Sequence, residues 1–594
     1  MCLGKPGKKV TQNHLIGTLI WLMKILTLLV PPGSTVLLLV FNLPKLAHQS
    51  ITTTSQLSKP KLTLTQIFTH PFVESNHMQI TTTRISLLAI TWFLIFPWIA
   101  IVHAEDQPDL LELPSKDWRM YGGHLQRNFA NPLAKEIPDS WDIRDGTNVA
   151  FSIQLGSRAY GGPVMSDGRI LIGTNNEFPR DPLIDGDKGV MMCFSDKDGA
   201  FLWQIVHDKL AAGRVWDWPQ QGICSTPCIE GDRFYYIGNR CEAICADINT
   251  GKVHWKLDMI GELNVFPHNI ATCSPMIVGD TLFLVTSNGV DAAHLRVPSE
   301  DKPSFLALSK KDGSVLWSSN RPGQSRRNIM HGQWSNPTYA QPAGKPQVIF
   351  PGGDGWIYSF NPTGKLLWKF DCNPKDAIYR LGGRGTANDF VGTPVIYKDK
   401  LFIAVGQDPE HDTGVGHLYC IDITKNPKRE DKDVSPTLAT YEPEFNEQIN
   451  PDSAQVWHYG GPVTDDRPSP TDETYYFGRS MSTCAIMDDI LYITELGGHV
   501  HCLDANSGKL YWTENMFSNT WSSPCVADGK VFVGNDDGIM YVFKHGKEME
   551  LLSEIEHEDG TKLRTTPVAA NGRLYYMSES PTKLWAIEAG TNSK

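Results

Sequence analysis

The sequence predicts an all-β protein, an eight-bladed β-propeller whose blades are four-stranded and antiparallel. Three observations predict this fold class. A unit of about 40 to 64 residues recurs from residue 150 onward, Gly- and Asp-containing turns separate its short apolar strands, and a tryptophan marks the last strand of most copies. The 51 Gly and 39 Pro residues, found with 17 Trp, 18 Tyr and 24 Phe, agree with many short strands closed by tight turns.

The overall composition excludes several classes of protein. With 41% hydrophobic and 20% charged residues, the chain is not disordered as a whole. A formal net charge of −12 argues against a non-specific nucleic-acid binder, because phosphate binding needs a basic face. Twelve cysteines in 594 residues are too sparse for a disulfide scaffold.

The first hundred residues differ from the rest. The apolar run Leu15–Val40 precedes a Thr- and Ser-rich stretch, and a second run, Ile85–Val102, follows Arg84 and leads to Ala104. A charged start, an apolar centre and a small-residue end are typical of a secretory signal. We therefore expect residues 78–104 to be a signal peptide, residues 1–77 to be untranslated or a disordered apolar extension, and residues 105–147 to be a lead-in segment. The alternative is a membrane protein with two spanning helices.

Eight copies of a first-strand marker give the number of blades. The marker positions are Pro163, Pro227, Pro275, Pro337, Pro394, Cys484, Pro524 and Pro567. In each unit two further strands follow, and a D-x-x-x-G-K turn then leads to the fourth strand. The fourth strands are centred on Trp203, Trp255, Trp317, Trp368 and Trp512, with a delayed copy at Trp457.

The two ends of the repeat region predict how the ring closes. The last unit contains only three strands, in "TTPVAANG", "RLYYMSES" and "KLWAIEAG". The segment 148–155 ("NVAFSIQL") precedes the first complete unit and can supply the missing outer strand, which covers an exposed sheet edge. Residues 148–590 are therefore expected to form one propeller.

The unit "A-x-D-x-x-T-G-K-x-x-W" resembles the tryptophan-docking motif of the pyrroloquinoline quinone (PQQ) dehydrogenase family, the quinoprotein alcohol dehydrogenase-like superfamily. It is also similar to the PQQ-like repeat of non-enzymatic, BamB-like relatives. The resemblance covers residues 115–590. It implies, for the enzymes, PQQ on the ring axis, a calcium ion held by Glu and Asn side chains, and an Asp acting as general base. Many of these enzymes also carry two adjacent cysteines, which this sequence lacks, and the absence of C-x-x-C-H predicts no haem domain.

The cysteines recur at equivalent strand positions, as in Cys193, Cys245, Cys420 and Cys502. Such recurrence predicts small buried side chains rather than metal ligands. Disulfides within the pairs Cys224–Cys228 and Cys241–Cys245 remain an alternative, but a strand separates such positions by about 13 Å.

Candidate ligand-binding residues lie in the turns and blade connections of one face. For a metal, the sequence favours Asn176 with Glu177, whose oxygens suit calcium. For PQQ or another anionic ligand, it favours Arg380 and Arg384, with Trp334 and His331 in a neighbouring connection; this list also serves a stacking wall. The loop 406–416 is a weaker metal candidate. Alternatively, these turns are polar simply because they are solvated.

Two functions follow from these features. The first is an exported binding or scaffold module of the periplasm or cell envelope, with a protein, glycan or small molecule bound at the propeller mouth and no nucleic-acid partner. The second is a PQQ- and calcium-dependent alcohol or sugar dehydrogenase. A membrane-anchored sensor is a third reading if the N-terminal apolar segments are retained.

Overall fold

The computed structural model describes residues 116–158, 160–325, 332–375, 377–378, 385–407, 414–425, 431–438, 448–580 and 582–593. All of them belong to one compact unit, Trp98–Lys594. The expected signal peptide at 78–104, the extension at 1–77 and the lead-in before residue 116 lie outside the described residues. Within the described ranges, no helix is long and apolar enough to cross a membrane.

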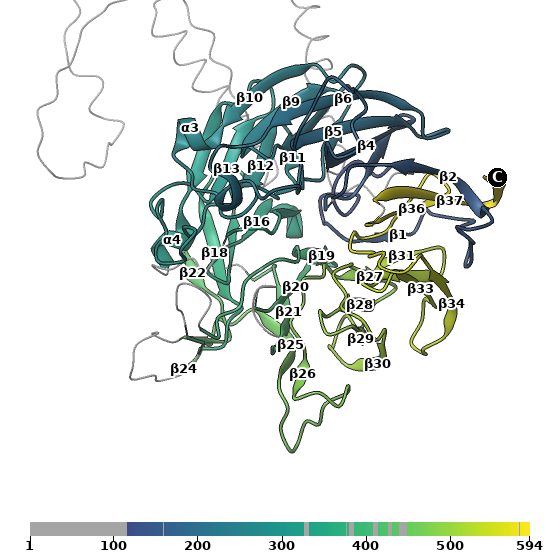
Figure 1. Cartoon of the computed structure of the whole chain (residues 1–594). Helices are drawn as coiled ribbons and strands as arrows, with labels where there is room; N and C mark the ends of the chain where they lie inside the picture. Colours follow the sequence, from purple (N-terminus) through teal and green to yellow (C-terminus); the bar gives the residue numbers. More distant parts are fainter. Residues whose placement is uncertain are drawn as a thin grey trace, which may run out of the picture. The chain divides into compact units, whose positions relative to one another are not determined.

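The described unit is a ring of eight four-stranded antiparallel sheets, which confirms the predicted fold class (Figure 1). Blades 1 to 4 consist of β3 (Val164–Ser166), β4 (Arg169–Asn175), β5 (Lys188–Ser195) and β6 (Phe201–Asp208); β7 (Cys228–Glu230), β8 (Arg233–Ile237), β9 (Glu242–Asp247) and β10 (Val253–Asp258); β11 (Met276–Val278), β12 (Thr281–Val285), β13 (Phe305–Ser309) and β14 (Val315–Ser319); β15 (Thr338–Ala340), β16 (Gln347–Pro351), β17 (Trp356–Phe360) and β18 (Leu366–Asp371). Blades 5 to 8 consist of β19 (Val395–Tyr397), β20 (Lys400–Val405), β21 (His417–Asp422) and β25 (Gln455–Pro462); β27 (Ala485–Met487), β28 (Ile490–Thr494), β29 (His499–Asp504) and β30 (Leu510–Asn515); β31 (Cys525–Ala527), β32 (Lys530–Gly534), β33 (Ile539–Lys544) and β34 (Leu551–Glu556); β35 (Val568–Ala570), β36 (Arg573–Ser578), β37 (Lys583–Asn592) and β2 (Thr147–Gln154).

A few short elements extend or connect the blades. They are β1 (Ala130–Asn131), β22 (Lys432–Asp433), β23 (Thr437–Leu438), β24 (Gln448–Ile449), β26 (Tyr475–Phe477), the helices α3 (Met259–Leu263) and α4 (Arg321–Ser325), and the 3₁₀ turns η3 (Gly213–Val215) and η4 (Pro342–Gly344). Helix α3 begins at Asp258, whose carboxylate accepts from the first free backbone N–H groups.

Tight turns hold the first two strands of a blade together. Asp167 and Gly168 both have positive φ, at 50° and 73°, and Asp528 and Gly529 repeat this at 50° and 72°. This backbone is the hairpin turn whose twist matches the twist of the strands, and Asp-Gly pairs adopt it readily. The Gly/Asp turns recognised in the sequence are therefore hairpin turns.

The ring closes as the sequence predicts, because β2 pairs with β37. At this junction Phe151 takes the place of a docking tryptophan. A Cβ atom on Gly199 would lie 2.8 Å from the Phe151 ring, so the ring packs directly on the turn of blade 1. One blade thus combines both ends of the propeller sequence, and no sheet edge remains open at the seam.

The repeated tryptophans join each blade to the next. Trp203 of blade 1 donates its indole N–H to the carbonyl of Ile248 in blade 2 at 3.1 Å. The same bond recurs from Trp255 to Lys310, Trp317 to Pro362, Trp457 to Ala505 and Trp512 to Gly546. The turn glycine must lack a side chain, since a Cβ atom on Gly251 would come within 2.7 Å of the Trp203 ring.

The register explains why cysteine recurs. Each of the four repeated cysteines lies directly opposite the docking tryptophan of its own blade; the pairs are Cys193 with Trp203, Cys245 with Trp255, Cys420 with Trp457 and Cys502 with Trp512. Ala307 occupies the same place opposite Trp317. A small side chain is needed there, which confirms the prediction of buried packing residues. All eleven described cysteines are buried and free, so neither alternative disulfide forms.

The most unexpected feature lies on the ring axis, where residues 116–131 run past every blade. We call this segment the axial strap. Its contacts, in order, are Lys116 with Asn571, Trp118 with Met165, Arg119 with Ile229, Arg127 with Ser274, Leu125 with Tyr339, Gln126 with Ile396, Asn128 with Ile486, Phe129 with Val526 and Asn131 with Ala569. These contacts reach the inner strand of each blade, or the residues next to it, and end where they began, on blade 8.

Candidate functional site: the axial cavity

A cavity of about 430 Å³ lies on the ring axis above the axial strap. Its floor is formed by Trp118, Tyr121 and Phe129 of the strap. Its walls come from the connections that lead into the inner strands of all eight blades; among them are Tyr160, Trp218, Ile270, Trp334, Val391, Met481, Trp521 and Thr566. A cavity of this size suits a small-molecule ligand.

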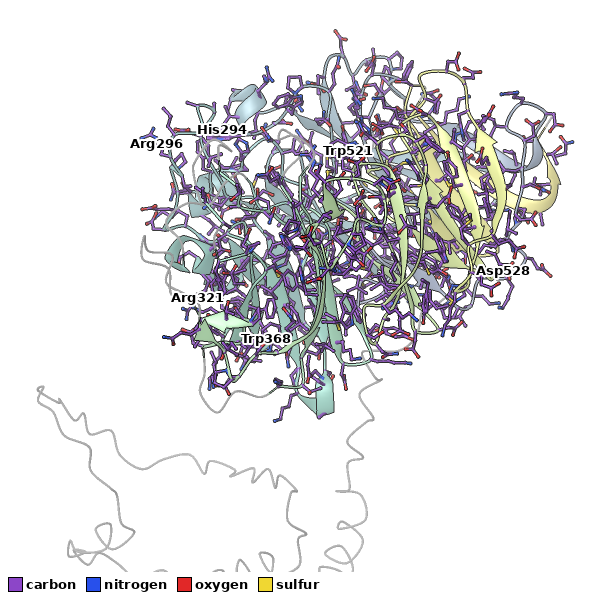
Figure 2. All side chains as sticks on the ribbon, turned by 90° about the horizontal axis from the view of Figure 1, so that it is seen from below. His294, Arg296, Arg321, Trp368, Trp521 and Asp528 are labelled. Atoms are coloured by element: carbon purple, nitrogen blue, oxygen red, sulfur yellow. The ribbon has the colours of Figure 1, made fainter. Side chains whose placement is uncertain are left out.

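The face that carries the cavity is set by topology. Residues in the blade connections, such as Trp521, lie toward one face of the ring, together with His294 of the blade 3 loop (Figure 2). Asp528, in the hairpin turn after β31, lies toward the other face (Figure 2). The strap contacts the inner strands between these two levels, so it closes the axial channel beneath the cavity.

Aromatic rings dominate the cavity. Seven of the described lining residues are Trp, Tyr or Phe: Trp118, Tyr121, Phe129, Tyr160, Trp218, Trp334 and Trp521. Two of the tryptophans are held by guanidinium groups, with Arg214 4.0 Å above the Trp218 ring and Arg564 4.6 Å above the Trp521 ring. Such cation–π contacts orient the rings before a ligand arrives.

The remaining lining is mostly neutral and polar. Hydroxyl and amide groups come from Gln221, Thr226, Asn269, Thr272, Ser274, Asn336, Ser523, Thr565 and Thr566. Arg564 is the only charged residue among the described lining residues, and its two nitrogens bind both carboxylate oxygens of Asp536 at 2.8 and 2.6 Å. Burial opposes the charged form of Arg564, but Asp536 outweighs it and raises the pKa. The charge is therefore largely compensated within the protein.

A second buried charge pair lies beside this one. Glu579 accepts from Arg158 at 2.9 Å, while its other carboxylate oxygen is buried with no hydrogen-bond partner. Burial raises the pKa of Glu579, although Arg158 and Arg564 oppose the rise. Burial, helped by the charge of Glu579, also raises the pKa of Tyr160 on the cavity wall.

The lining can be tested against the cofactors of the resemblance. Flat indole rings and one guanidinium suit a planar, carboxylated quinone. Calcium needs six to eight oxygen ligands, usually including carboxylates, and none of the described lining residues has a carboxylate. Nor do the described residues contain a group of three His, Cys, Asp or Glu side chains placed to hold a metal ion. The described part of the cavity therefore does not fit a calcium ion.

The structure separates the residues that the sequence grouped as a site. Trp334 lies on the cavity wall. His331, Arg380 and Arg384 lie outside the described residues, as does most of the loop 406–416. Trp218, expected only as part of the general mouth, is also on the wall.

Asn176 and Glu177 lie in a different, shallow pocket of about 340 Å³, together with Asp185, Asp187 and Gln220. Asn176 is 4% exposed and donates to the carbonyl of Ile184 at 2.9 Å, while its own side-chain oxygen has no hydrogen-bond partner. Glu177 is exposed. The metal site at this pair remains a prediction, and it is not part of the axial cavity.

Several of the polar turns expected at the mouth are buried structural caps. Glu495 is fully buried; it accepts from His499 at 2.8 Å and lies 3.4 Å from His501. Burial opposes ionisation of Glu495, but the two histidines prevail and hold its pKa at about 2. Asp354 similarly binds the Tyr358 hydroxyl at 2.6 Å. These groups satisfy the blade's own turn and are not directed at a ligand.

Sequence reasoning missed the floor of the cavity. Trp118, Tyr121 and Phe129 belong to the lead-in, outside every repeat, so no periodic pattern points to them. The signal that could have found them is composition: "WRMYGGHLQRNF" contains three aromatics and two adjacent glycines in a segment with no strand pattern.

The chain can now be compared with known proteins. Residues 186–440 and 447–593 match the family model of the outer membrane protein assembly factor BamB. Among curated proteins, none matches the sequence.

Solved structures share the fold at low identity. A quinohemoprotein alcohol dehydrogenase from Pseudomonas putida HK5 is 13% identical, with a TM-score of 0.52 over 81% of each chain. A europium-containing methanol dehydrogenase is 15% identical, with a TM-score of 0.49 over 80% of this chain and 90% of its own. BamB from Moraxella catarrhalis is 14% identical, with a TM-score of 0.46 over 75% of this chain and 99% of its own. Because the matching residues span more than half of the sequence, this protein belongs to the family of the outer membrane protein assembly factor BamB, whose PQQ-like repeat forms the propeller.

Proposed function

We propose that this protein is an exported binding module of the periplasm or cell envelope that takes a neutral, ring-shaped ligand, a saccharide, into the axial cavity. The observation that carries the proposal is the combination of seven aromatic side chains with neutral hydroxyl and amide groups around a closed-bottom cavity. The family match agrees with binding, because the matched relatives are named for assembly and not for a reaction.

The chemistry of the lining favours a neutral sugar over a charged ligand. A sugar ring presents C–H groups on its faces and hydroxyls at its edges, which suit indole faces and amide or hydroxyl partners respectively. Since Asp536 already binds Arg564 through both oxygens, a ligand gains little by bringing its own negative charge.

Two tryptophans of one connection provide a matched test. Trp218 lines the cavity, whereas Trp216, two residues away, packs on Phe266 and is not part of the lining. We expect soluble disaccharides such as cellobiose and maltose to change the tryptophan fluorescence of the full-length protein. Trp218→Ala should weaken that binding by about tenfold or more, and Trp216→Ala by less than about threefold. Equal losses in the two variants, or no binding of any disaccharide to the wild type, would overturn the proposal.

One observation favours the second function, a PQQ- and calcium-dependent alcohol or sugar dehydrogenase. The tryptophan walls and Arg564 are suited to stack and bind a planar quinone carboxylate. Incubation with PQQ and calcium, followed by absorbance of bound quinone and dye reduction with alcohols, separates the two functions. Bound quinone with turnover would establish the dehydrogenase, and neither signal would leave the binding module.

Export can be tested separately. We propose that residues 78–104 are removed on secretion. N-terminal sequencing of the secreted protein should begin near Glu105, and a retained apolar segment would instead support a membrane anchor.

A further inference from the structure

We infer that the axial strap, residues 116–131, is the specificity-determining floor of the cavity and that Arg127 is the positioning residue that locks it in place. This inference rests on the proposed function for the ligand, but not for the lock. The strap is not a blade and contains no copy of the repeat, yet it contacts all eight blades.

Arg127 is the strongest sign that the strap is held deliberately. Its side chain is 0% exposed, and its guanidinium donates to four backbone carbonyls. The acceptors are Tyr121 at 2.9 Å, Pro337 at 2.9 Å, Ser274 at 3.0 Å and Pro275 at 3.2 Å. Among the described residues no carboxylate pairs with Arg127, so carbonyl dipoles alone stabilise the charge. Burying a cation in this way is unfavourable unless every donor is satisfied, and burial lowers the pKa of Arg127.

The four acceptors show what the lock joins. Ser274 and Pro275 precede the inner strand of blade 3, and Pro337 precedes that of blade 4. Tyr121 belongs to the strap itself and forms part of the cavity floor. One guanidinium therefore links two blades to the residue beneath the ligand.

The strap backbone is shaped to allow this arrangement. Arg127 has a φ of 60°, and a Cβ atom on Gly122, whose φ is 71°, would lie 2.5 Å from the Arg127 backbone. The chain therefore folds back on itself between Tyr121 and Arg127, and this places two floor residues together. The rings of Tyr121 and Phe129 are 4.9 Å apart and nearly perpendicular.

Side chains of the floor decide how deep the cavity is. Tyr121 projects across it and hydrogen-bonds through its hydroxyl to Thr483 of the opposite wall at 2.9 Å. Shortening this side chain deepens the site without changing any blade. The strap thus sets the length of ligand that the cavity accepts, while the eight connections set its width.

The lock is tested in the full-length protein by cutting the chain after folding. Lys135 and Glu136 are exposed and follow the strap, so a specific protease site can be inserted between them. We expect the cleaved N-terminal fragment to remain bound to the propeller during size-exclusion chromatography. Immediate dissociation from the wild-type ring would overturn the inference without any need for a variant.

Two arginines of the strap then give a matched comparison. Arg127→Met should release the fragment at least about tenfold faster, whereas Arg119→Met should not change release, because the Arg119 side chain is half exposed and pairs only with Asp117 among described groups. Equal release from both variants would show that Arg127 is not the lock. If Arg127→Met does not fold, Arg127→Lys, which keeps the charge but loses the fork of donors, is compared instead.

The floor is tested by ligand length. In Tyr121→Ala, we expect the ratio of trisaccharide to disaccharide affinity to rise about fivefold or more, for cellotriose against cellobiose. An unchanged ratio would refute the specificity role. If no saccharide binds to the wild type, the proposed function fails while fragment retention still decides the lock.

Discussion

The indole N–H of Trp368 donates to the side-chain oxygen of Gln347 at 3.0 Å, within its own blade, whereas the other docking tryptophans reach a backbone carbonyl of the next blade. The amide nitrogen of Gln347 then donates to the carbonyl of Ile423 in blade 5 at 2.9 Å. Gln347 therefore relays the docking bond across a junction where the turn of blade 5 lacks its glycine.

Removing this relay should destabilise the propeller. Gln347→Leu leaves the Trp368 N–H and the Ile423 carbonyl buried without partners, and each loss costs about 1 to 3 kcal/mol. We expect the free energy of unfolding in urea to fall by about 2 to 4 kcal/mol. Gln448→Leu, at an exposed position, is the control and should change stability by less than about 0.5 kcal/mol. A similar small change in Gln347→Leu would contradict the relay.

The turn glycines can be tested with two positions that share a backbone conformation. Gly313 and Gly168 have φ values of 76° and 73°, but only a Cβ atom on Gly313 would collide, at 2.6 Å from the Trp255 ring. Gly168→Ala should cost about 1 kcal/mol from backbone strain alone. Gly313→Ala should cost at least about 2 kcal/mol more, measured by thermal unfolding, because the docked indole must move. Equal effects would show that docking does not select the glycine.

The cysteines should be unreactive in the native protein. All eleven described cysteines are buried, and burial raises the pKa of the Cys224 thiol to about 12 and that of Cys228 to about 11. Since the thiolate is the reactive form, we expect no labelling by Ellman's reagent at pH 8 until the protein is unfolded. A reductant should leave the melting temperature unchanged. Rapid labelling of any of these cysteines, or a reductant-sensitive melt, would disagree with the structure.

Acidification should weaken the fold through buried histidines. Burial lowers the pKa of His557 to about 4, and burial together with His458 and Arg467 lowers that of His417 to about 3. The unfolded chain then binds protons below about pH 6.5 that the folded chain does not, so stability falls as the pH decreases from 6.5 toward 4. The loss attributable to His557 is about 3 kcal/mol at the lower limit.

His557→Gln isolates this effect, because glutamine does not titrate and can still hydrogen-bond to the Tyr576 hydroxyl, which His557 contacts at 3.1 Å. The variant should show a shallower decline in urea stability between pH 6.5 and 4. Parallel pH profiles for the variant and the wild type would show that His557 titrates normally in the folded state.

Much of the propeller was predictable because its information is local and repeated. The Pro markers identified eight first strands, and the three strands at the C-terminus required a fourth, which Asn148–Leu155 supplies almost at the bounds of β2. The recurring cysteines were correctly interpreted as packing residues, although their exact role, facing the docking indole, needed the strand register.

The candidate site was predicted only in part. Trp334 does line the cavity, but Asn176 and Glu177 belong to a separate pocket. The polar turns looked like ligand donors because a sequence shows which residues are polar and not which are already satisfied. Glu495 illustrates this, since its two histidine partners lie four and six residues further along the same hairpin and hold it as a buried ion pair.

What the sequence by itself determined is the number of blades, their docking residues and the closure of the ring, because hairpin turns, strand alternation and a repeated Trp–Gly pair act over short distances. Only the tertiary structure decided that residues 116–131 fill the axis and that the binding cavity stands on them. The strap is held chiefly by backbone carbonyls and N–H groups of eight separate blades, far away along the chain. Every residue type presents the same backbone groups, so such contacts leave no pattern in the sequence, and they exist only once the ring has closed around the segment.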